Sequence, residues 1–355
     1  MLKLAYDFSR RAISTFRGRP IANAAERPFC DWGEADLHRE VSPAVLSDEL
    51  DRLSASILSV ANRYKHSRGR DFQDHLQGVA GLLQRWEQDA LTVQIGLFHS
   101  AYSTQQYPYG LYTYQQRDKL RALIGDDAER LVFLFCSHDR VDLYAQAAEL
   151  AKAGATLPRN GLELRNALTG STARVPAQLI APLLVVHAAD LAEQIDGFSF
   201  DIISGLLACA EPWIKAPECL QVLRAAGVTG KALSIRIQAE RGTFGLAPVL
   251  GLSKTLLADR LRLARLLRGR GPLNDRSRAQ LDALDERLPG LFEVPWIRLH
   301  RDSRGDQARA DAALADARLR HHTWGVPWLK RPFDRNLSYQ TLIQGVKLDR
   351  HDSGN

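Results

Sequence analysis

Apolar residues recur at helical spacing in two neighbouring segments near the first third of the chain. In residues 71–88 they repeat every three or four positions, which predicts an amphipathic helix with His75 on its apolar stripe. Residues 89–101 are almost entirely apolar and predict a central core helix with His99 at its end. Each predicted helix therefore places a histidine where a hydrophobic residue is expected.

A third apolar segment, residues 177–197, predicts another buried helix. His187, Asp190 and Glu193 interrupt it at intervals of three. Residues at this interval share one face of a helix, so the three polar side chains are expected to point the same way.

The rest of the pattern is also mainly helical. It predicts a helix over 43–66, an aromatic loop over 103–116, helices over 116–124 and 126–153, and a short β-hairpin around Thr169–Gly170. Beyond Pro212, mixed Arg/Ala/Leu segments predict further helices. The fold class is all-α: a helical bundle with one short hairpin and a helical C-terminal extension.

Length supports a division of the chain into parts. At 355 residues the chain exceeds a typical single domain. The pattern favours an N-terminal leader over 1–44, a helical domain over 45–210 and a helical C-terminal region over 211–355.

Composition excludes several function classes. The formal net charge of +6 is spread along the chain, which argues against nucleic-acid binding. No window holds eighteen consecutive apolar residues, so no membrane span is expected. The four cysteines are far apart, and the N-terminus lacks the apolar run of a secretory signal, so a cytoplasmic location is expected.

His75, His99 and Asp190 are the candidate metal ligands. Burying one such group without a partner costs about 1–3 kcal/mol, so three on core helices need an explanation. A shared divalent ion, Mn, Fe, Zn or Co, supplies one, because neutral imidazoles and a carboxylate suit these metals. The alternative is that each histidine is a core residue with an ordinary hydrogen-bond partner.

A family resemblance favours the metal. The two helices that carry the histidines form the stretch "DFQDHLQGVAGLLQRWEQDALTVQIGLFHSAYST", and Asp190 lies in "LLVVHAADLAEQ". These stretches resemble the HD superfamily, specifically the hydrolase domain of the guanosine tetraphosphate synthetase/hydrolases and an uncharacterised HD-like family with His-Ser in place of His-Asp. The resemblance covers about residues 66–200. It implies an HD-like bundle in which His75, His99 and Asp190 bind metal.

The chain departs from that pattern in three places. Ser100 stands where the superfamily has the aspartate that follows the second histidine, and a hydroxyl cannot bridge two cations as a carboxylate does. Ser103 and Thr104 stand where the nucleotide hydrolases carry an acidic pair that assists water attack. One ion rather than two is therefore expected.

Other residues are candidates around this site. His138 and His187 fall where HD-type oxygenases and phosphodiesterases recruit additional ligands, although each could instead be a supporting or surface residue. Glu193 is a candidate general base or partner of a histidine, with a plain exposed glutamate as the alternative. Ser100 and Tyr102 are candidate catalytic groups, and the loop that contains Tyr102 either lines a pocket or packs on its own aromatic rings.

Three functions remain open from the sequence. The first is a mononuclear HD-like enzyme that hydrolyses a small-molecule or nucleotide-like substrate through metal-bound water. The second is an iron-dependent oxygenase of HD type, because two histidines and one carboxylate also bind Fe(II). The third is a catalytically degenerate HD domain that serves as a ligand- or partner-binding scaffold. Whether the chain forms a homo-oligomer stays open.

Overall fold

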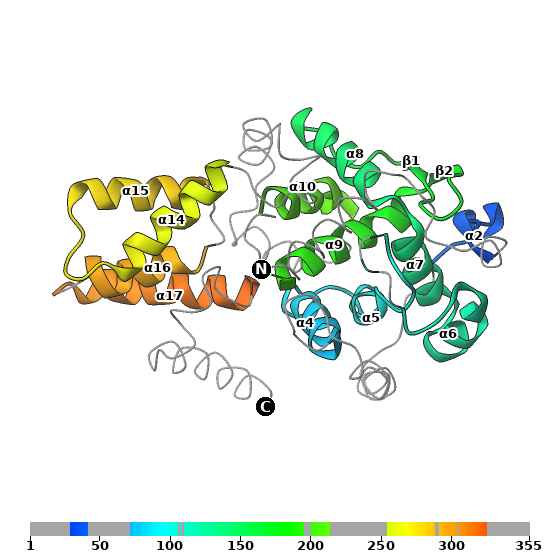
Figure 1. The fold of residues 1–355 in the computed structure, drawn as a ribbon, viewed down its shortest axis with the longest axis horizontal. Helices are drawn as coiled ribbons and strands as arrows, with labels where there is room; N and C mark the ends of the chain where they lie inside the picture. The colour runs from blue at the N-terminus through cyan, green and yellow to red at the C-terminus, as the bar shows by residue number, and fades with distance from the viewer. Residues whose placement is uncertain are drawn as a thin grey trace, which may run out of the picture.

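The computed structural model describes residues 29–41, 72–105, 107, 110–194, 200–213, 254–287, 291–303 and 305–324. It confirms the all-α class, with one two-stranded antiparallel sheet among the described residues. The predicted helix over 43–66 lies outside them. Figure 1 shows the helices of the first two hundred residues on one side and those after residue 254 on the other.

Helix α9 (Ala177–Gln194) runs through the middle of the larger group of helices. It packs against α4 (Phe72–Arg85), α5 (Ala90–Phe98) and α10 (Phe200–Ala210), and it also touches α7 (Asp126–Ser137). The apolar segments that predicted α4, α5 and α9 all contribute to one hydrophobic core. The helices expected to carry the metal ligands are therefore packed side by side.

The segment predicted as one helix over 126–153 is two helices, so that prediction was wrong. Helix α7 (Asp126–Ser137) ends at His138, which takes an extended conformation and pairs with Asn166. Helix α8 (Arg140–Lys152) then begins. Asp139 starts the second helix, because its side chain accepts hydrogen bonds from the backbone N–H groups of Val141 and Asp142.

The hairpin is confirmed. Strand β1 (Leu162–Arg165) pairs antiparallel with β2 (Thr172–Val175), and Gly170 in the turn has a φ of 81°, a conformation that glycine adopts without strain. Shorter elements complete this part: α2 (Glu34–His38), the 3₁₀ turns η3 (Tyr114–Gln116) and η4 (Glu211–Trp213), and α6 (Arg117–Ile124).

Part of the segment assigned to the leader packs on this core. Cys30 and Leu37 are buried in it, and Arg130 of α7 donates to the backbone carbonyls of Asp36 and Arg39 at the end of α2. Residues before position 45 therefore pack against the helical domain.

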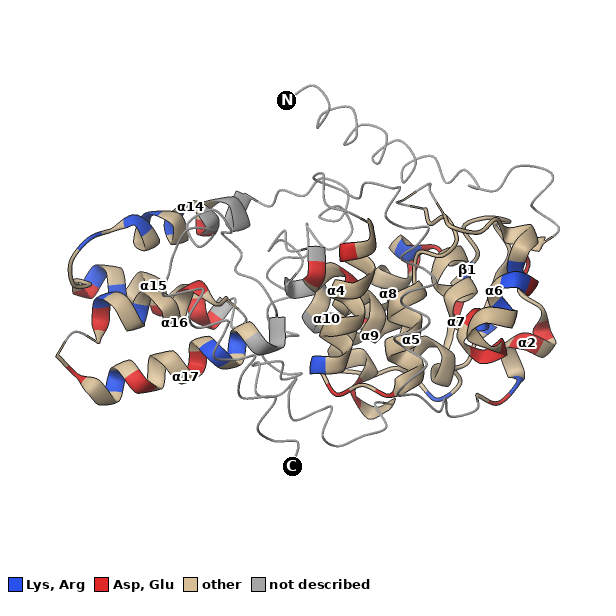
Figure 2. Ribbon diagram, turned by 90° about the horizontal axis from the view of Figure 1, so that it is seen from below, with Lys and Arg blue, Asp and Glu red and all other residues tan. Residues whose placement is uncertain are grey.

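The helices after residue 254 form separate small cores. They are α14 (Lys254–Arg268), α15 (Asp275–Arg287), α16 (Glu293–Ile297), the π-helical turn η5 (Arg298–Asp302) and α17 (Gln307–Trp324). Arginines join these helices, since Arg298 and Arg320 both pair with Asp285. Figure 2 shows charged residues dense on this part and sparse on α5, α9 and α10. Among the described residues, no helix is long and apolar enough to cross a membrane.

Candidate metal centre

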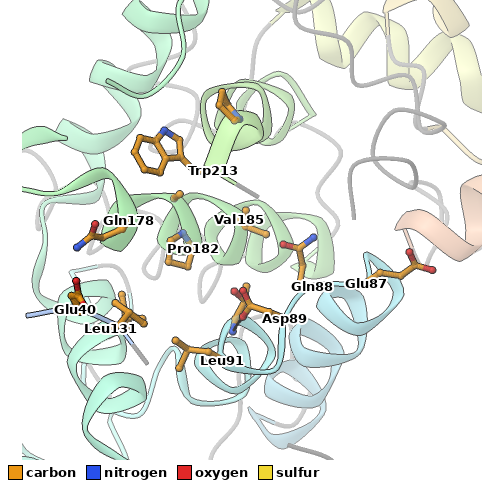
Figure 3. Close-up of a pocket in the computed structure, with 14 residues that line it drawn as sticks. Glu40, Glu87, Gln88, Asp89, Leu91, Leu131, Gln178, Pro182, Val185 and Trp213 are labelled. Atoms are coloured by element: carbon orange, nitrogen blue, oxygen red, sulfur yellow. Dashed lines mark hydrogen bonds between the residues drawn. The ribbon is translucent and has the colours of Figure 1, made fainter. Parts of the chain in front are cut away.

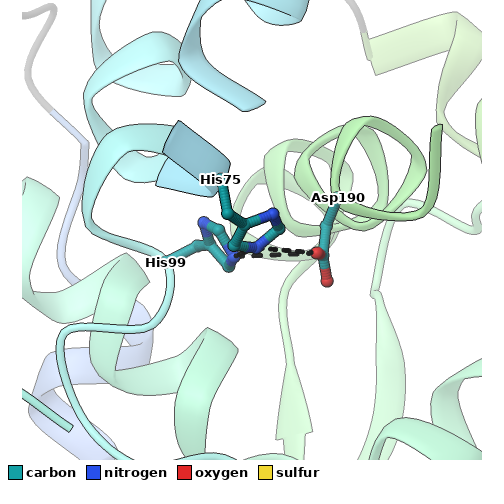
Figure 4. A group of neighbouring side chains, drawn as sticks. All are labelled: His75, His99 and Asp190. Carbon is teal, nitrogen blue, oxygen red and sulfur yellow. Dashed lines mark hydrogen bonds and ion pairs between the residues drawn. The ribbon is translucent and has the colours of Figure 1, made fainter. Parts of the chain in front are cut away.

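His75, His99 and Asp190 come together in the core, as predicted. His75 lies one turn into α4, His99 caps the C-terminal end of α5, and Asp190 lies in the last turns of α9. All three side chains are buried, with at most 2% of their surface exposed. Figure 4 shows both imidazole rings directed toward the carboxylate.

The three ligand atoms are spaced as one metal ion requires. The Nε2 atoms of His75 and His99 are 3.1 Å apart, and they lie 3.4 Å and 3.7 Å from Oδ1 of Asp190. A point equidistant from the three atoms lies about 2.0 Å from each, which matches a metal–imidazole bond. The group of three could therefore hold a metal ion.

Hydrogen bonds on the far side of each ring fix which nitrogen faces the centre. Nδ1 of His99 donates to the carbonyl of Gly96 at 2.7 Å, and Nδ1 of His75 donates to Oε2 of Glu193 at 2.6 Å. With the proton held on Nδ1, the lone pair of each Nε2 can point at the shared centre. Both rings are thus set in the tautomer that binds metal.

Glu193 reaches His75 because α4 carries a glycine at the point of contact. A Cβ atom placed on Gly78 would lie 2.7 Å from Oε1 of Glu193, too close for any other residue without movement. The arrangement of carboxylate, histidine and metal site is common in metalloproteins, where the carboxylate orients the ring and raises its basicity. Of the roles considered for Glu193, the geometry favours the partner of a histidine.

Arg140 completes the surroundings of Asp190. Its guanidinium donates to Oδ2 at 3.3 Å while Oδ1 faces the histidines. The arginine side chain is itself buried and lies near the ring of Phe135. Asp190 is therefore held by a fixed positive charge on one side and is available to a metal on the other.

The electrostatics of the three residues reflect this packing. Burial alone lowers the pKa of His75, but hydrogen bonds to Asp190 and Glu193 outweigh it and raise the pKa to about 9. Burial lowers the pKa of His99 to about 4. Burial raises the pKa of Asp190, yet the hydrogen bond from His75 and the nearby positive charges hold it well below its usual value. Because the pKa of His75 is raised, a metal ion must displace a proton from this histidine when it binds.

His138 and His187 form a second pair rather than joining the first. Nδ1 of His138 donates to the carbonyl of Leu134, so its Nε2 accepts from Nε2 of His187 at 3.0 Å. The hydroxyl of Tyr144 then donates to Nδ1 of His187 at 3.3 Å. Burial lowers the pKa of both histidines, to about 4 for His138. This chain of hydrogen bonds supports a structural role over metal binding.

The shared face predicted for α9 is thus divided between two contacts. Asp190 and Glu193 meet His75, whereas His187 meets His138 and stacks on Phe135.

Tyr102 is directed elsewhere. Its hydroxyl donates at 2.8 Å to Glu129, a fully buried carboxylate that also accepts from Arg117. Its ring stacks on Tyr114, so this part of the loop packs on its own aromatic side chains. Ser100 is buried beside His99 along the chain. The catalytic roles of Tyr102 and Ser100 stay predictions, and the geometry gives Tyr102 a structural contact.

Comparison with known proteins assigns no activity. Residues 58–140 match a family model described as a domain of unknown function (DUF6817), a stretch that contains His75 and His99 but not Asp190. No curated protein matches the chain. No solved structure matches it either.

Sequence reasoning missed two residues of this site. Arg140 follows a polar "SHD" stretch and gave no pattern that points at α9, and Gly78 is one of two glycines within α4. A glycine inside a strongly periodic helix costs about 1 kcal/mol relative to alanine, and such a cost is a signal of close packing.

Proposed function

We propose that this protein is a mononuclear metal-dependent hydrolase of HD-like type that holds one divalent ion on His75, His99 and Asp190. The observation that carries the proposal is the placement of the two imidazole rings, whose Nδ1 atoms face protein acceptors and whose Nε2 atoms face Asp190. Each has its Nδ1 proton bound to a protein acceptor, and each presents Nε2 to the same point as Oδ1 of Asp190. Two histidines with only a structural role would not need to direct both Nε2 atoms and a carboxylate oxygen at one point.

The residues of the chain would divide the work at such a centre. A bound divalent ion supplies a Lewis acid that lowers the pKa of its water toward neutrality. Glu193 holds the ring of His75 and its tautomer, and Arg140 holds Asp190 so that a single oxygen faces the ligands. Since positions 100, 103 and 104 carry hydroxyls instead of carboxylates, the chain offers no acid there to take the proton of the water.

A second candidate, a degenerate HD domain that serves as a scaffold, is favoured by the burial of the three ligands. Closed metal sites are typical of structural ions, whereas catalytic sites keep a position open to water or substrate. The hydroxyl residues in place of catalytic carboxylates favour the same reading. An iron-dependent oxygenase uses the same ligand types and is distinguished by the metal found.

Metal analysis of the purified protein tests the proposal. We expect about one Mn, Fe, Zn or Co per chain, lost in His99→Ala and in Asp190→Ala. The matched control is His38→Gln, which changes an exposed histidine on α2 and should keep the metal. A metal-free protein whose stability is unchanged in these variants contradicts the metal centre.

Hydrolysis is tested separately on the metal-loaded chain. We expect release of nitrophenol from bis(p-nitrophenyl) phosphate, or phosphate from a panel of nucleotides, that disappears with the metal and in His99→Ala. Stoichiometric metal with no turnover of any substrate supports the scaffold, and an iron signal that changes under oxygen supports the oxygenase.

A further inference from the structure

A cavity of about 640 Å³ lies beside Pro182 and Trp213 (Figure 3). Its carboxylates do not converge on one point. Asp89 caps α5 by accepting from the backbone N–H of Thr92, and Glu40 lies at the other end of the cavity. The cavity therefore specifies no charged ligand, whereas like charges do gather on α14 and α15.

Exposed arginines surround the turn that joins α14 to α15. Two lie on α14, one in the turn and one in the first turn of α15: Arg265, Arg268, Arg270 and Arg276. We call these four residues the arginine cluster. Figure 2 shows the basic positions at the end of α14 and the start of α15.

The arginine cluster lacks the aspartate partners of other arginines in this part of the chain. Those partnered arginines form the pairs Arg262–Asp259, Arg278–Asp302, Arg298–Asp285, Arg309–Asp306 and Arg320–Asp285. Within the ranges that the structure describes, no ion pair includes a member of the cluster. The nearby Asp275 pairs with Arg278 at 3.0 Å. The cluster therefore keeps its positive charges for a partner outside the chain.

Hydrogen bonds hold the turn in one shape. Arg301 donates from Nη1 to the carbonyl of Leu266 at 2.6 Å and from Nε to that of Gly271 at 2.8 Å. The side chain of Asn274 accepts from the backbone N–H of Ser277 at 2.9 Å and so caps α15. A turn fixed in this way keeps the clustered charges together, so that little ordering is needed when they bind a partner.

A large apolar side chain is exposed on the same face of α14. Leu261 exposes 51% of its surface, the most of any large hydrophobic residue in the described ranges. It lies four and seven residues before Arg265 and Arg268, so the three side chains fall within about 60° around the helix. Leu263 and Leu266 lie on the other side of the helix and pack into its small core. The outer face of α14 thus combines basic residues with one leucine.

We propose that the arginine cluster and Leu261 form a docking surface for a membrane that contains anionic lipids. The guanidinium groups pair with the lipid headgroups, and Leu261 enters the boundary between headgroups and acyl chains. Each arginine near an anionic bilayer adds about fivefold to the partition coefficient. Moving a half-exposed leucine out of water adds about fivefold more. This surface is separate from the metal centre and does not depend on the proposed hydrolase.

Nucleic acid is the other polyanion that arginines bind, and the structure favours it less. Nucleic-acid phosphates would leave Leu261 in water. Single strands are usually held by aromatic rings that stack on their bases, and α14 and the turn after it contain no aromatic residue. Lipid headgroups account for both the charge and the exposed leucine.

Vesicle flotation of the full chain tests the proposal. One set of vesicles is phosphatidylcholine alone, and the other contains about one third phosphatidylserine. We expect binding to the anionic vesicles to be at least about tenfold stronger than to the neutral ones. Binding should also weaken at least about tenfold as sodium chloride rises from about 0.05 M to 0.5 M, because salt screens charges that stay in water.

Variants assign the binding to this surface. Arg265→Gln/Arg268→Gln should lose about 30-fold in partitioning, and Leu261→Gln about fivefold. The matched control is Arg309→Gln/Arg318→Gln, which removes the same charge from exposed positions of α17, on the other side of α16 in Figures 1 and 2. It should change partitioning less than about twofold. All these positions are exposed, so the melting temperatures should stay near that of the wild type.

Three results would overturn the proposal. The first is equal binding to the two kinds of vesicle, and the second is a loss in the control variant as large as in the cluster variant. The third is binding to a DNA duplex of about thirty base pairs that is lost in Arg265→Gln/Arg268→Gln, with no binding to either vesicle, which would assign the cluster to nucleic acid.

Discussion

The contact between Gly78 and Glu193 gives the sharpest test of how this metal centre is held. In Gly78→Ala the new Cβ atom would lie 2.7 Å from Oε1 and 2.8 Å from Cγ of Glu193. Ordinary van der Waals contacts of a Cβ atom begin at about 3.4 Å, so the carboxylate oxygen must move by roughly 0.7 Å to reach one. Its 2.6 Å hydrogen bond to Nδ1 of His75 would then lengthen past 3 Å or break.

The expected loss is in metal affinity rather than in folding. Removing the carboxylate partner of a metal-binding histidine typically costs about 10–100-fold in affinity, or about 1.4–2.7 kcal/mol. Alanine is also the better helix former by about 1 kcal/mol, which offsets the steric cost in the metal-free protein. The variant should therefore bind metal more weakly while its unfolding without metal changes little.

Competition with a chromogenic chelator measures the affinity, and thermal unfolding with the metal removed measures the stability. Gly81→Ala is the matched control in the same helix, because a Cβ atom there meets only the end of the Arg85 side chain, at 3.9 Å. If Gly78→Ala binds metal as tightly as Gly81→Ala, Glu193 does not position a metal ligand and the reasoning fails.

Three other predictions concern neighbouring features. Glu193→Gln keeps an acceptor for Nδ1 of His75, whereas Glu193→Leu removes it. Chelator competition should therefore show the highest metal affinity in the wild type, a lower one in Glu193→Gln and the lowest in Glu193→Leu. Equal affinity in all three would count against a role of this contact in metal binding. Burial holds the pKa values of His138 and His187 below 6.5, so the unfolded chain binds more protons and stability should fall as the pH drops from about 6.5 toward 4, by about 1.4 kcal/mol per pH unit for each histidine. The raised pKa of His75 changes the pH dependence of stability only above that window. In urea unfolding, the free energy of unfolding of His138→Leu/His187→Phe should fall less steeply below about pH 6.5 than that of the wild type. Equal slopes would refute the lowered pKa values of His138 and His187. Asp139→Ala removes the cap of α8 and should lower the free energy of unfolding by about 1 kcal/mol in urea titrations, against no change for the exposed Asp118→Asn.

Periodicity was enough to determine the helices that carry the site. Apolar residues at helical spacing in α4, and nearly continuous apolar residues in α5 and α9, fixed three buried elements and placed His75, His99 and Asp190 within them. A polar ligand-type residue on such a helix is expensive to bury alone, so the sequence already indicated that the three needed a common partner.

Where the chain turns between elements was harder to read. The apolar pattern of 126–153 continues through His138, and only the capping by Asp139 and the pairing with Asn166 divide it into α7 and α8. The capping bonds run to residues two and three positions on, and the pairing joins His138 to a residue distant in the sequence; apolar periodicity predicts neither.

Tertiary structure alone decided which polar residues meet. His187, Asp190 and Glu193 share an interval of three, yet each step turns the side chain by about 60° around α9. His187 therefore meets His138, whereas the other two meet His75. Differences of a few tenths of an ångström in the spacing of the helices decide three features of the site. They are the tautomers of the ligands, the hydrogen bond from Arg140 to Asp190 and the close approach of Glu193 to Gly78. Sequence periodicity fixes the face of a helix, whereas the packing of neighbouring helices fixes what that face touches.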